Sequence, residues 1–270
     1  MNTALVTGSS TGVGFALTRR LLREGWRVIT LDRSGHPVDD DVGLAAERES
    51  RLQRYKVDLA DLPALHTVLD TLLATGEAID VVFNNAGVST PVPTSSKQGR
   101  DLNFELNTVV PYVVAARLVP ALQRGTDKTI INVSSNAQLY ARGFDLDRLA
   151  VGVTPHRSLV GPYAHSKLAL SLWTQAAADR FAADGIEIRS VCPGPNQTPM
   201  TAKMAWWTWP LRQLLFTSPT VGADRVYDAA FKHRGARGVW LNKGKPTPSP
   251  QAGLAPQILA LVDGIATASR

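Results

Sequence analysis

Short hydrophobic runs alternate along the chain with longer segments in which hydrophobic residues recur at helical spacing. The short runs are typical of buried strands, and the longer segments are typical of helices that cross from one strand to the next. The alternation therefore predicts an α/β domain built on a parallel sheet. The expected strands cover residues 4–6, 27–31, 52–57, 79–83, 129–133, 186–191 and 238–241, and the expected helices cover residues 14–23, 62–73, 103–122, 162–183 and 221–231.

Three segments do not follow this alternation. Residues 136–160 are polar and contain glycine, and they are too long for a simple connection, so we expect them to be functional. Residues from about 195 to 218 are rich in proline and tryptophan, and residues 244–270 are expected to form an extended tail with a final helix. The helix over 103–122 is expected to bend near Pro111. No composition break divides the chain, so a single domain is expected over residues 1–270.

Composition and charge narrow the classes of function. Of the 270 residues, 44% are hydrophobic and 19% are charged, which is ordinary for a globular protein with a substantial core. The formal net charge is +6, but no long run of Lys and Arg and no nucleic-acid-binding motif is present. We therefore expect no nucleic-acid partner, and we interpret the dispersed basic charge as an attraction for an anionic dinucleotide.

The single cysteine, Cys192, excludes an intrachain disulfide and a metal cluster built from cysteines. We expect its thiol to be buried and unreactive. The first residues lack the features of a signal peptide, and no apolar run is long enough to span a bilayer. These observations predict a cytoplasmic protein with no membrane span and no bound metal.

The segment Thr7–Gly14 (TGSSTGVG) stands between the first expected strand and the first expected helix. Glycines in this position allow a tight turn and a close approach of the backbone to a pyrophosphate. The helix that follows offers unpaired N–H groups and the positive end of its dipole to that anion. The sequence therefore predicts a phosphate-binding turn, with a glycine-rich turn that holds no ligand as the alternative. The residues expected to contact the cofactor here are Gly8, Ser10, Thr11, Gly12, Val13 and Gly14.

Asp32 and Arg33 follow the second expected strand, where the adenine ribose lies in this topology. A carboxylate accepts hydrogen bonds from the ribose hydroxyls of NAD and repels the 2′-phosphate of NADP. Arg33 could pair with that phosphate instead. We favour NAD, because Asp32 would have to be displaced before a phosphate could fit and because Thr11 adds no positive charge. In the alternative interpretation, Asp32 caps a turn and Arg33 is only solvated.

Tyr163 and Lys167 are one helical turn apart, so both side chains face the same side of their helix. A cation favours the ionised form of a phenol, so Lys167 is expected to lower the pKa of Tyr163 and to let it exchange a proton nearer neutral pH. Ser135 is expected to donate a hydrogen bond to the substrate oxygen, with Ser134 as the alternative. Asn107 is expected to position a water that links Lys167 to solvent.

Together, these motifs resemble the short-chain dehydrogenase/reductase family in its single-domain branch. The resemblance implies a Rossmann-type, doubly wound parallel sheet of seven strands in a three-layer α/β/α fold. Family members usually form dimers or tetramers through two long helices, so the resemblance also implies a homodimer or homotetramer. The matching motifs are Thr7–Gly14, Asn84–Gly87 (NNAG), Asn107, Ser135, and Tyr163 with Lys167. Further cofactor contacts are implied at Asp58, Leu59, Asn85, Ala86, Gly87, Tyr163, Lys167, Pro193, Gly194 and Thr198.

Within the family, the segments Tyr163–Ala169 (YAHSKLA) and Ser249–Ala252 (SPQA) resemble the retinol-dehydrogenase-like members. Asp32 differs from these members, in which the second strand usually ends in a way that suits NADP. Pro193 and Gly194 match the family's loop beside the nicotinamide. The segment after this loop often forms a mobile lid in this fold, and its composition indicates an apolar or aromatic substrate. A buried helix, an oligomer contact or a loose membrane contact is the alternative. The residues of this segment are Met204, Trp206, Trp207, Trp209, Leu211, Leu214, Leu215 and Phe216. Tyr140, Phe144 and Leu146 are expected to complete the pocket, and His156 and His165 are expected to be structural or exposed.

The function expected from these motifs is an NAD(P)-dependent oxidoreductase that interconverts a small-molecule alcohol and a ketone or aldehyde. The alternative is a sensor or scaffold protein that binds NAD(P) without chemistry, and the intact set of Ser135, Tyr163 and Lys167 argues against it. Epimerase or dehydratase chemistry on nucleotide sugars fits less well, because that branch of the family usually has a longer chain and a different glycine spacing.

Overall fold

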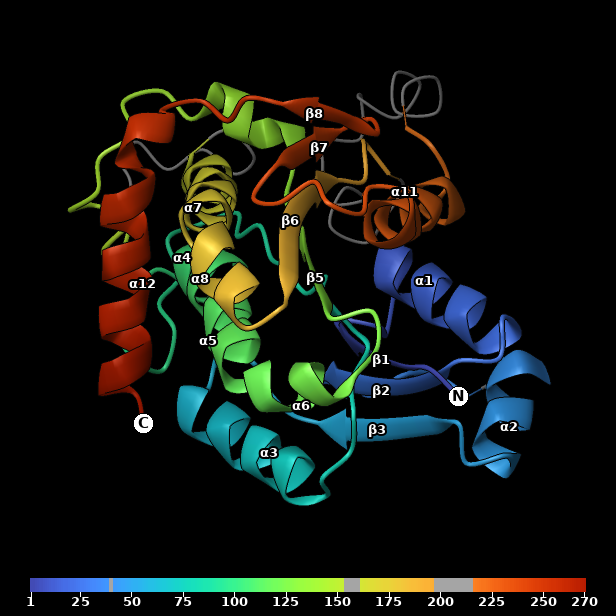
Figure 1. Cartoon of the computed structure of the whole chain (residues 1–270). Helices are drawn as coiled ribbons and strands as arrows, with labels where there is room; N and C mark the ends of the chain where they lie inside the picture. Colours follow the sequence, from blue (N-terminus) through green and yellow to red (C-terminus); the bar gives the residue numbers. More distant parts are fainter. Residues whose placement is uncertain (39–40, 153–160, 197–215) are drawn as a thin grey trace.

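An eight-stranded sheet runs through the middle of the molecule, with helices on both faces (Figure 1). The computed structural model describes residues 1–38, 41–152, 161–196 and 216–270. The strands are β1 Thr3–Thr7, β2 Arg27–Asp32, β3 Leu52–Lys56, β4 Val81–Asn84, β5 Thr129–Val133, β6 Glu187–Cys192, β7 Trp240–Asn242 and β8 Lys245–Thr247. The α-helices are α1 Gly12–Arg23, α2 Asp41–Arg48, α3 Leu62–Ala74, α4 Leu102–Phe104, α5 Val110–Arg117, α6 Val119–Arg124, α7 Pro162–Ala176, α8 Ala178–Ala183, α11 Pro219–Phe231 and α12 Ala255–Ala268.

The strand order is β3-β2-β1-β4-β5-β6-β7-β8, and every pair from β3 to β7 is parallel. The order reverses between β1 and β4, and in doubly wound sheets ligands bind at the carboxyl ends of the strands at such a point. The prediction of seven parallel strands is corrected by β8, which pairs with β7 in the antiparallel direction. Lys243 and Gly244 both have positive φ angles, as a two-residue hairpin requires. Pro246 is tolerated because β8 is an edge strand.

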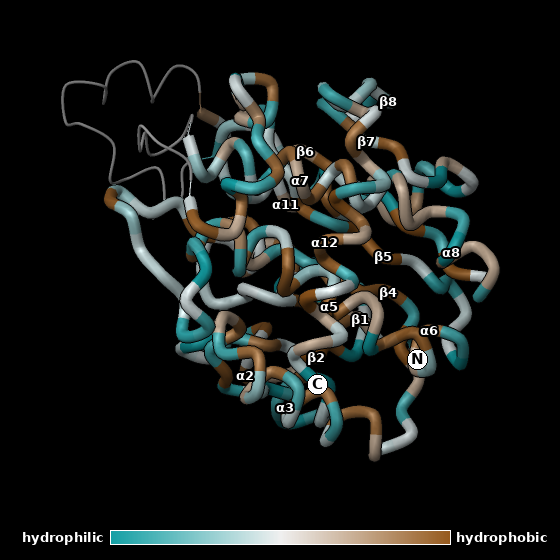
Figure 2. Tube along the Cα trace, turned by 90° about the vertical axis from the view of Figure 1, so that its left-hand side faces the viewer, coloured by the Kyte–Doolittle hydropathy of each residue, from teal (hydrophilic) through white to brown (hydrophobic). Residues whose placement is uncertain are grey.

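Two hydrophobic cores lie on the opposite faces of the sheet, because alternate residues of each strand point to opposite sides. On β1, Leu5 joins the core under α3, α5, α7 and α12, whereas Ala4 and Val6 join the core under α1 and α11. Figure 2 shows hydrophobic residues along the central strands and hydrophilic residues in the outer loops. This division produces the expected three layers. In the described parts of the chain, none of the helices combines the length and hydrophobicity needed to cross a bilayer.

Both long helices are interrupted. The first is divided into α4, a π-helical turn η1 (Glu105–Val109), α5 and α6, so the irregularity expected near Pro111 lies immediately before it. A second break at Leu118 precedes Pro120. The second long helix is divided at Ala177 into α7 and α8. The polar segment after β5 begins with a 3-10 turn, η2 (Asn136–Tyr140), and the tail contains another, η4 (Ala252–Leu254).

The C-terminal helix α12 lies across the outer side of α5 and α7 (Figure 1). Tyr112 donates a hydrogen bond from its hydroxyl to Asp263 Oδ1 at 2.5 Å, and Arg180 donates to the same oxygen at 3.1 Å. At the end of α12, His66 Nε2 lies 3.1 Å from Ser269 Oγ. Because α5 and α7 belong to the two long helices, α12 covers the face expected to contact a second subunit.

Candidate active site

The glycine turn between β1 and α1 is packed so tightly that side chains cannot replace two of its glycines. Gly8 has φ +69°, and a Cβ there would lie 2.7 Å from the Cα of Ala86. A Cβ on Gly14 would lie 2.1 Å from the Gly8 carbonyl oxygen. Asn85 Nδ2 donates to the carbonyls of Thr7 at 3.0 Å and Gly8 at 2.9 Å. The segment after β4 therefore holds the turn in place, which the sequence did not indicate.

The first turn of α1 has the features of an anion site. Thr11 is its N-cap, but its side chain makes no capping hydrogen bond, so the first N–H groups of the helix are not used by a cap. The first turn contains no acidic side chain that would repel a phosphate. Ser10 lies immediately before this N-cap, and Gly12 and Val13 begin the helix; their contact with a cofactor stays a prediction. These residues fit the pyrophosphate of a dinucleotide, which would lie on the positive end of the helix dipole.

Asp32 lies at the end of β2 with its carboxylate against the glycine turn. It is 2% exposed, and it accepts hydrogen bonds from Ser9 Oγ at 2.5 Å and from the N–H of Ser10 at 3.2 Å. Burial raises the pKa of Asp32, and the hydrogen bond from Ser9 opposes this rise. Arg33 is exposed. The carboxylate thus supports the turn, and the lone pairs left on its two oxygens are compatible with a ribose contact as well.

The expected adenine contacts follow β3, beside Asp32. The N–H of Val57 donates to the carbonyl oxygen of Asp32 at 2.9 Å, which brings the ends of β2 and β3 together. Asp58 is exposed, and its Oδ1 accepts from the N–H of Ala60 at 3.1 Å. Leu59 is buried in the core beside it. The structure therefore places both predicted residues at the same edge of the sheet as the glycine turn.

Tyr163 and Lys167 are both buried on α7, facing the end of β5. Lys167 Nζ donates to the carbonyl oxygen of Val133 at 2.7 Å. The phenol of Tyr163 shares a hydrogen bond with Ser135, whose Oγ also accepts from the N–H of Ala137 at 3.1 Å. The structure therefore brings together the phenol, the serine and the lysine that the sequence singled out.

Ser134 has a different environment. Its side chain is 2% exposed, and its Oγ donates to the carbonyl oxygen of Lys167 at 3.1 Å. Ser171 Oγ donates to Ser134 Oγ at 2.9 Å. These partners lie inside the protein between β5 and α7, so Ser134 holds the helix on the sheet, whereas Ser135 faces Tyr163.

Asn107 lies in the π-helical turn, with both N–H groups of its side chain engaged. They donate to the carbonyl oxygen of Val88 at 2.8 Å and to Ser166 Oγ at 2.9 Å. A Cβ on Gly87 would lie 3.0 Å from Asn107 Oδ1 and 3.3 Å from Lys167 Nζ, so Asn107 and Lys167 both lie against Gly87. The side chain thus joins three segments of the site, and the role expected for it in positioning a water stays a prediction.

The electrostatics of the pair differ from the prediction. Burial raises the pKa of Tyr163 to about 12, and the hydrogen bond with Ser135 opposes this rise. Burial also lowers the pKa of Lys167 to about 7. The expectation that Lys167 lowers the pKa of the phenol is therefore wrong for the protein alone, because desolvation outweighs the hydrogen bond with Ser135 and also weakens the charge on the lysine.

The loop after β6 is held by contacts from α11. Gly194 has φ +87°, and a Cβ there would lie 2.0 Å from Arg225 Nη1, which donates to the carbonyl oxygen of Pro193 at 2.9 Å. Asn196 Nδ2 donates to the carbonyl oxygen of Gly194 at 2.7 Å. Arg225 was missed in the sequence, because nothing in its neighbourhood marks a contact 32 positions away. Thr198, an expected cofactor contact, lies outside the described residues.

The expected substrate pocket is only partly within the described residues. Phe144 and Leu146 pack against the hydrophobic core, whereas Tyr140 is 59% exposed. His165 Nε2 lies 3.1 Å from the carbonyl oxygen of Arg142, and the buried ring contacts Phe144, which confirms its structural role. Cys192 is buried, as predicted, and burial raises the pKa of its thiol; its low reactivity stays a prediction. His156 and all of the expected lid except its ends lie outside the described residues.

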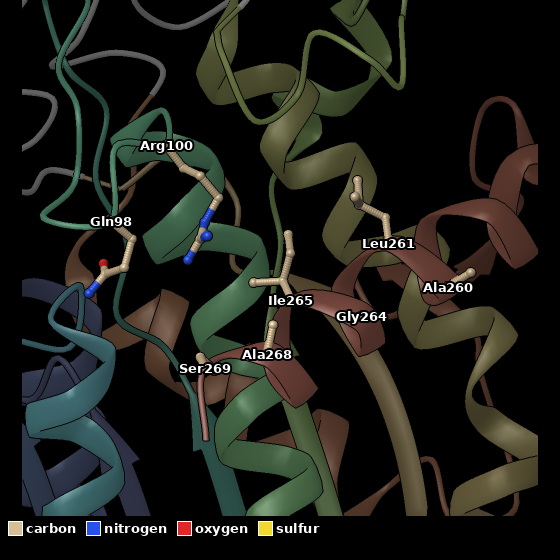
Figure 3. Close-up of a pocket in the computed structure, with 8 residues that line it drawn as sticks. All are labelled: Gln98, Arg100, Ala260, Leu261, Gly264, Ile265, Ala268 and Ser269. Carbon is tan, nitrogen blue, oxygen red and sulfur yellow. The ribbon is translucent and has the colours of Figure 1, made fainter.

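A separate pocket of about 480 Å³ lies beside α12 (Figure 3). No predicted site residue lines it. The Arg100 guanidinium in its wall pairs with the buried carboxylate of Glu105, so this charge is already compensated. The lining residues are Gln98, Arg100, Ala260, Leu261, Gly264, Ile265, Ala268 and Ser269.

The sequence is similar to those of known dehydrogenases and oxidoreductases. The family model described as short chain dehydrogenase matches residues 2–144 and 151–208. Retinol dehydrogenase 11 of Homo sapiens is 28% identical over 232 residues, which cover 84% of this chain and 72% of that protein. An uncharacterised oxidoreductase of Schizosaccharomyces pombe is 30% identical over 215 residues, which cover 73% of this chain. The match spans only 61% of the length of the yeast protein.

Solved structures share the fold. The NADPH-bound carbonyl reductase from chicken fatty liver has a TM-score of 0.67 at 18% identity, with 92% of this chain and 98% of that chain covered. A 4-hydroxyisoleucine dehydrogenase complexed with NADH has a TM-score of 0.67 at 19% identity, with 90% and 96% covered. These likenesses show a Rossmann-like α/β fold with a mostly parallel sheet, and the two related structures hold different nicotinamide cofactors.

Proposed function

The chain belongs to the short-chain dehydrogenase family of NAD(P)-dependent oxidoreductases that act on CH–OH groups, and from that premise we propose that it interconverts an alcohol and a ketone or aldehyde. The contact between Tyr163 and Ser135, with Lys167 on the same face of α7, is the observation that supports this proposal. Asn107 completes the set by holding the segments around Gly87 and α7 together.

The proposed roles follow from the protonation states. With its pKa raised to about 12, the Tyr163 phenol is protonated at neutral pH and can give this proton to a carbonyl oxygen. Ser135 donates a hydrogen bond to the same oxygen as negative charge develops there. The bound nicotinamide supplies or accepts the hydride. The ammonium of Lys167, tied to Val133, lies beside the site as an acid from which the phenolate of Tyr163 can recover its proton.

We propose NAD rather than NADP as the cofactor. The Asp32 carboxylate at the end of β2 supports this preference, because it would repel a 2′-phosphate. Arg33, which could attract such a phosphate, is exposed beside it. The proposed cofactor residues are otherwise those of the glycine turn, the segment after β4, and the loop that contains Pro193 and Gly194.

The proposed substrate is an apolar or aromatic alcohol or carbonyl compound. The tryptophan-rich residues 204–216 support this class by composition. The similarity to retinol dehydrogenase 11, which is named for an apolar alcohol, points the same way. We propose a cytoplasmic enzyme that acts without a nucleic-acid partner. A homodimer or homotetramer stays a prediction, and because α12 covers α5 and α7, we expect any such assembly to use another face.

A Tyr163→Phe variant tests the proposed mechanism. Turnover of a confirmed substrate should fall by about 10²- to 10⁴-fold, which is the usual contribution of a positioned proton donor. The affinity for the cofactor should change little. Tyr55→Phe, the same substitution on β3, is the control and should leave turnover unchanged. Unchanged turnover in Tyr163→Phe would contradict the mechanism, and binding of NADH without turnover of any alcohol or carbonyl compound would favour the sensor instead.

A further inference from the structure

Ser9, Asp32 and His36 form a buried chain of hydrogen bonds behind the glycine turn. Ser9 Oγ lies 2.5 Å from Asp32 Oδ2. His36 Nδ1 lies 3.1 Å from Ser9 Oγ and 3.0 Å from the carbonyl oxygen of Ser9. Each of the three side chains is at most 2% exposed. Neither Ser9 nor His36 was singled out in the sequence, because a lone histidine in a polar connection carries no recognisable pattern.

The partners determine the direction of these hydrogen bonds. A carbonyl oxygen only accepts, so His36 Nδ1 must carry the proton that it shares with the carbonyl of Ser9. The Ser9 hydroxyl has one hydrogen, which it donates to the ionised carboxylate of Asp32. The Ser9 oxygen is then an acceptor for the same His36 N–H. The series of hydrogen bonds therefore runs from His36 through Ser9 to Asp32.

The imidazole of His36 is held in this orientation by its neighbours. Its ring stacks on Phe15 of α1, with the ring centroids 5.2 Å apart and the planes 26° from parallel. Arg54 on β3 reaches the main-chain carbonyl of His36 at 3.4 Å. A rigid donor at this position matters, because burial favours the neutral form of Asp32 whereas hydrogen-bond donors favour its charged form.

We propose that His36 is a positioning residue that sets the preference for the cofactor. Acting through Ser9, it keeps the carboxylate of Asp32 charged and fixed at the place where the adenine ribose would bind. A charged, fixed carboxylate accepts hydrogen bonds from a ribose diol and repels a 2′-phosphate. This inference rests on the proposed function, in which Asp32 contacts the ribose.

Dissociation constants for NADH and NADPH, measured by fluorescence titration of the full chain, test the proposal. The wild-type protein should prefer NADH. His36→Phe keeps a ring against Phe15 but cannot donate to Ser9, and it should move the NADH-to-NADPH preference by about tenfold toward NADPH, equivalent to the loss of about one hydrogen bond. Ser9→Ala should produce a similar shift. His36→Asn, which keeps a donor near the position of Nδ1, should retain most of the preference.

His66→Phe is the matched control, because it replaces another mostly buried histidine that contacts α12 instead of the glycine turn. It should leave the preference unchanged. If the role of His36 were purely structural, His36→Phe would weaken the binding of NADH and NADPH equally, and that result would overturn the proposal. Ser9→Ala provides the same readout should His36→Phe fail to fold.

An Asp32→Asn variant separates the ribose contact of Asp32 from the role of His36. A changed preference in Asp32→Asn, combined with an unchanged preference in His36→Phe and Ser9→Ala, would overturn the role of His36 alone. An unchanged preference in Asp32→Asn would overturn the proposed ribose contact and the role of His36 with it. A wild-type protein that prefers NADPH, or that binds neither cofactor, would have the same consequence.

Discussion

Lys167 donates a hydrogen bond from Nζ to the main-chain carbonyl of Val133 at 2.7 Å, although both groups are buried. Burial lowers the pKa of this lysine from 10.5 to about 7. Between these values the unfolded chain binds more protons at this position than the folded chain. The contribution of Lys167 to the free energy of unfolding therefore rises with pH from about 7 to about 10.5.

A Lys167→Met variant should lose this pH dependence. Relative to the wild type, the variant should be most stable below the lowered pKa, where burying the ammonium costs most. The difference in free energy of unfolding between the variant and the wild type should shrink by on the order of a few kcal/mol as the pH approaches the ordinary lysine pKa. Urea unfolding at a series of pH values measures the difference. Parallel pH profiles for the two proteins would contradict the lowered pKa.

Ser135→Ala and Ser134→Ala should separate catalysis from stability. Ser135 faces the phenol of Tyr163, so its loss should reduce turnover by about 10²-fold and change unfolding little. Ser134 is enclosed between β5 and α7, so its loss should lower the free energy of unfolding by about 1–3 kcal/mol. Steady-state kinetics and denaturant unfolding of both variants provide the comparison. Equal effects of the two substitutions on turnover would mean that the choice of Ser135 is wrong.

Gly14→Ala should damage the cofactor site by steric overlap. The added Cβ would lie 2.1 Å from the Gly8 carbonyl oxygen and 2.3 Å from Asn85 Nδ2, so the glycine turn must move. We expect cofactor binding to be lost in calorimetric titration and the protein to be destabilised. Gly264→Ala on α12 is the control, because a Cβ there meets open space, and it should stabilise the protein by about 0.5–1 kcal/mol. Retained binding in Gly14→Ala would contradict this packing.

Asp263→Asn tests the attachment of α12. The hydrogen bond from Tyr112 lowers the pKa of this carboxyl, and its attraction to Arg180 adds to the effect. A carboxyl with a lowered pKa contributes stability above its ordinary pKa and loses it as the pH falls through the lowered value. Because solvent screens this partly exposed pair, we expect the variant to lose less than about 1 kcal/mol at neutral pH, and the loss should disappear in acid. A loss that is independent of pH would argue against the ion pair.

The sequence by itself determined the features that depend on neighbours along the chain. The order of strands and helices followed from hydrophobic spacing, and the turn at Gly8 followed from the need for a positive φ angle. The pairing of Tyr163 with Lys167 followed from helical geometry. Such features are local, because periodicity and backbone conformation are set by a few adjacent residues. For the same reason β5 was predicted with the bounds that the structure shows.

Only the tertiary structure decided the features that join distant segments. It chose Ser135 over Ser134 for the contact with Tyr163, and it paired Arg225 with the carbonyl of Pro193. It also added β8 and laid α12 over the long helices. It reversed the expected effect on the phenol of Tyr163, because the pKa of a buried group depends on how completely the fold removes water from it. Desolvation and contacts between distant residues exist only after the chain has packed, so local sequence patterns do not record them.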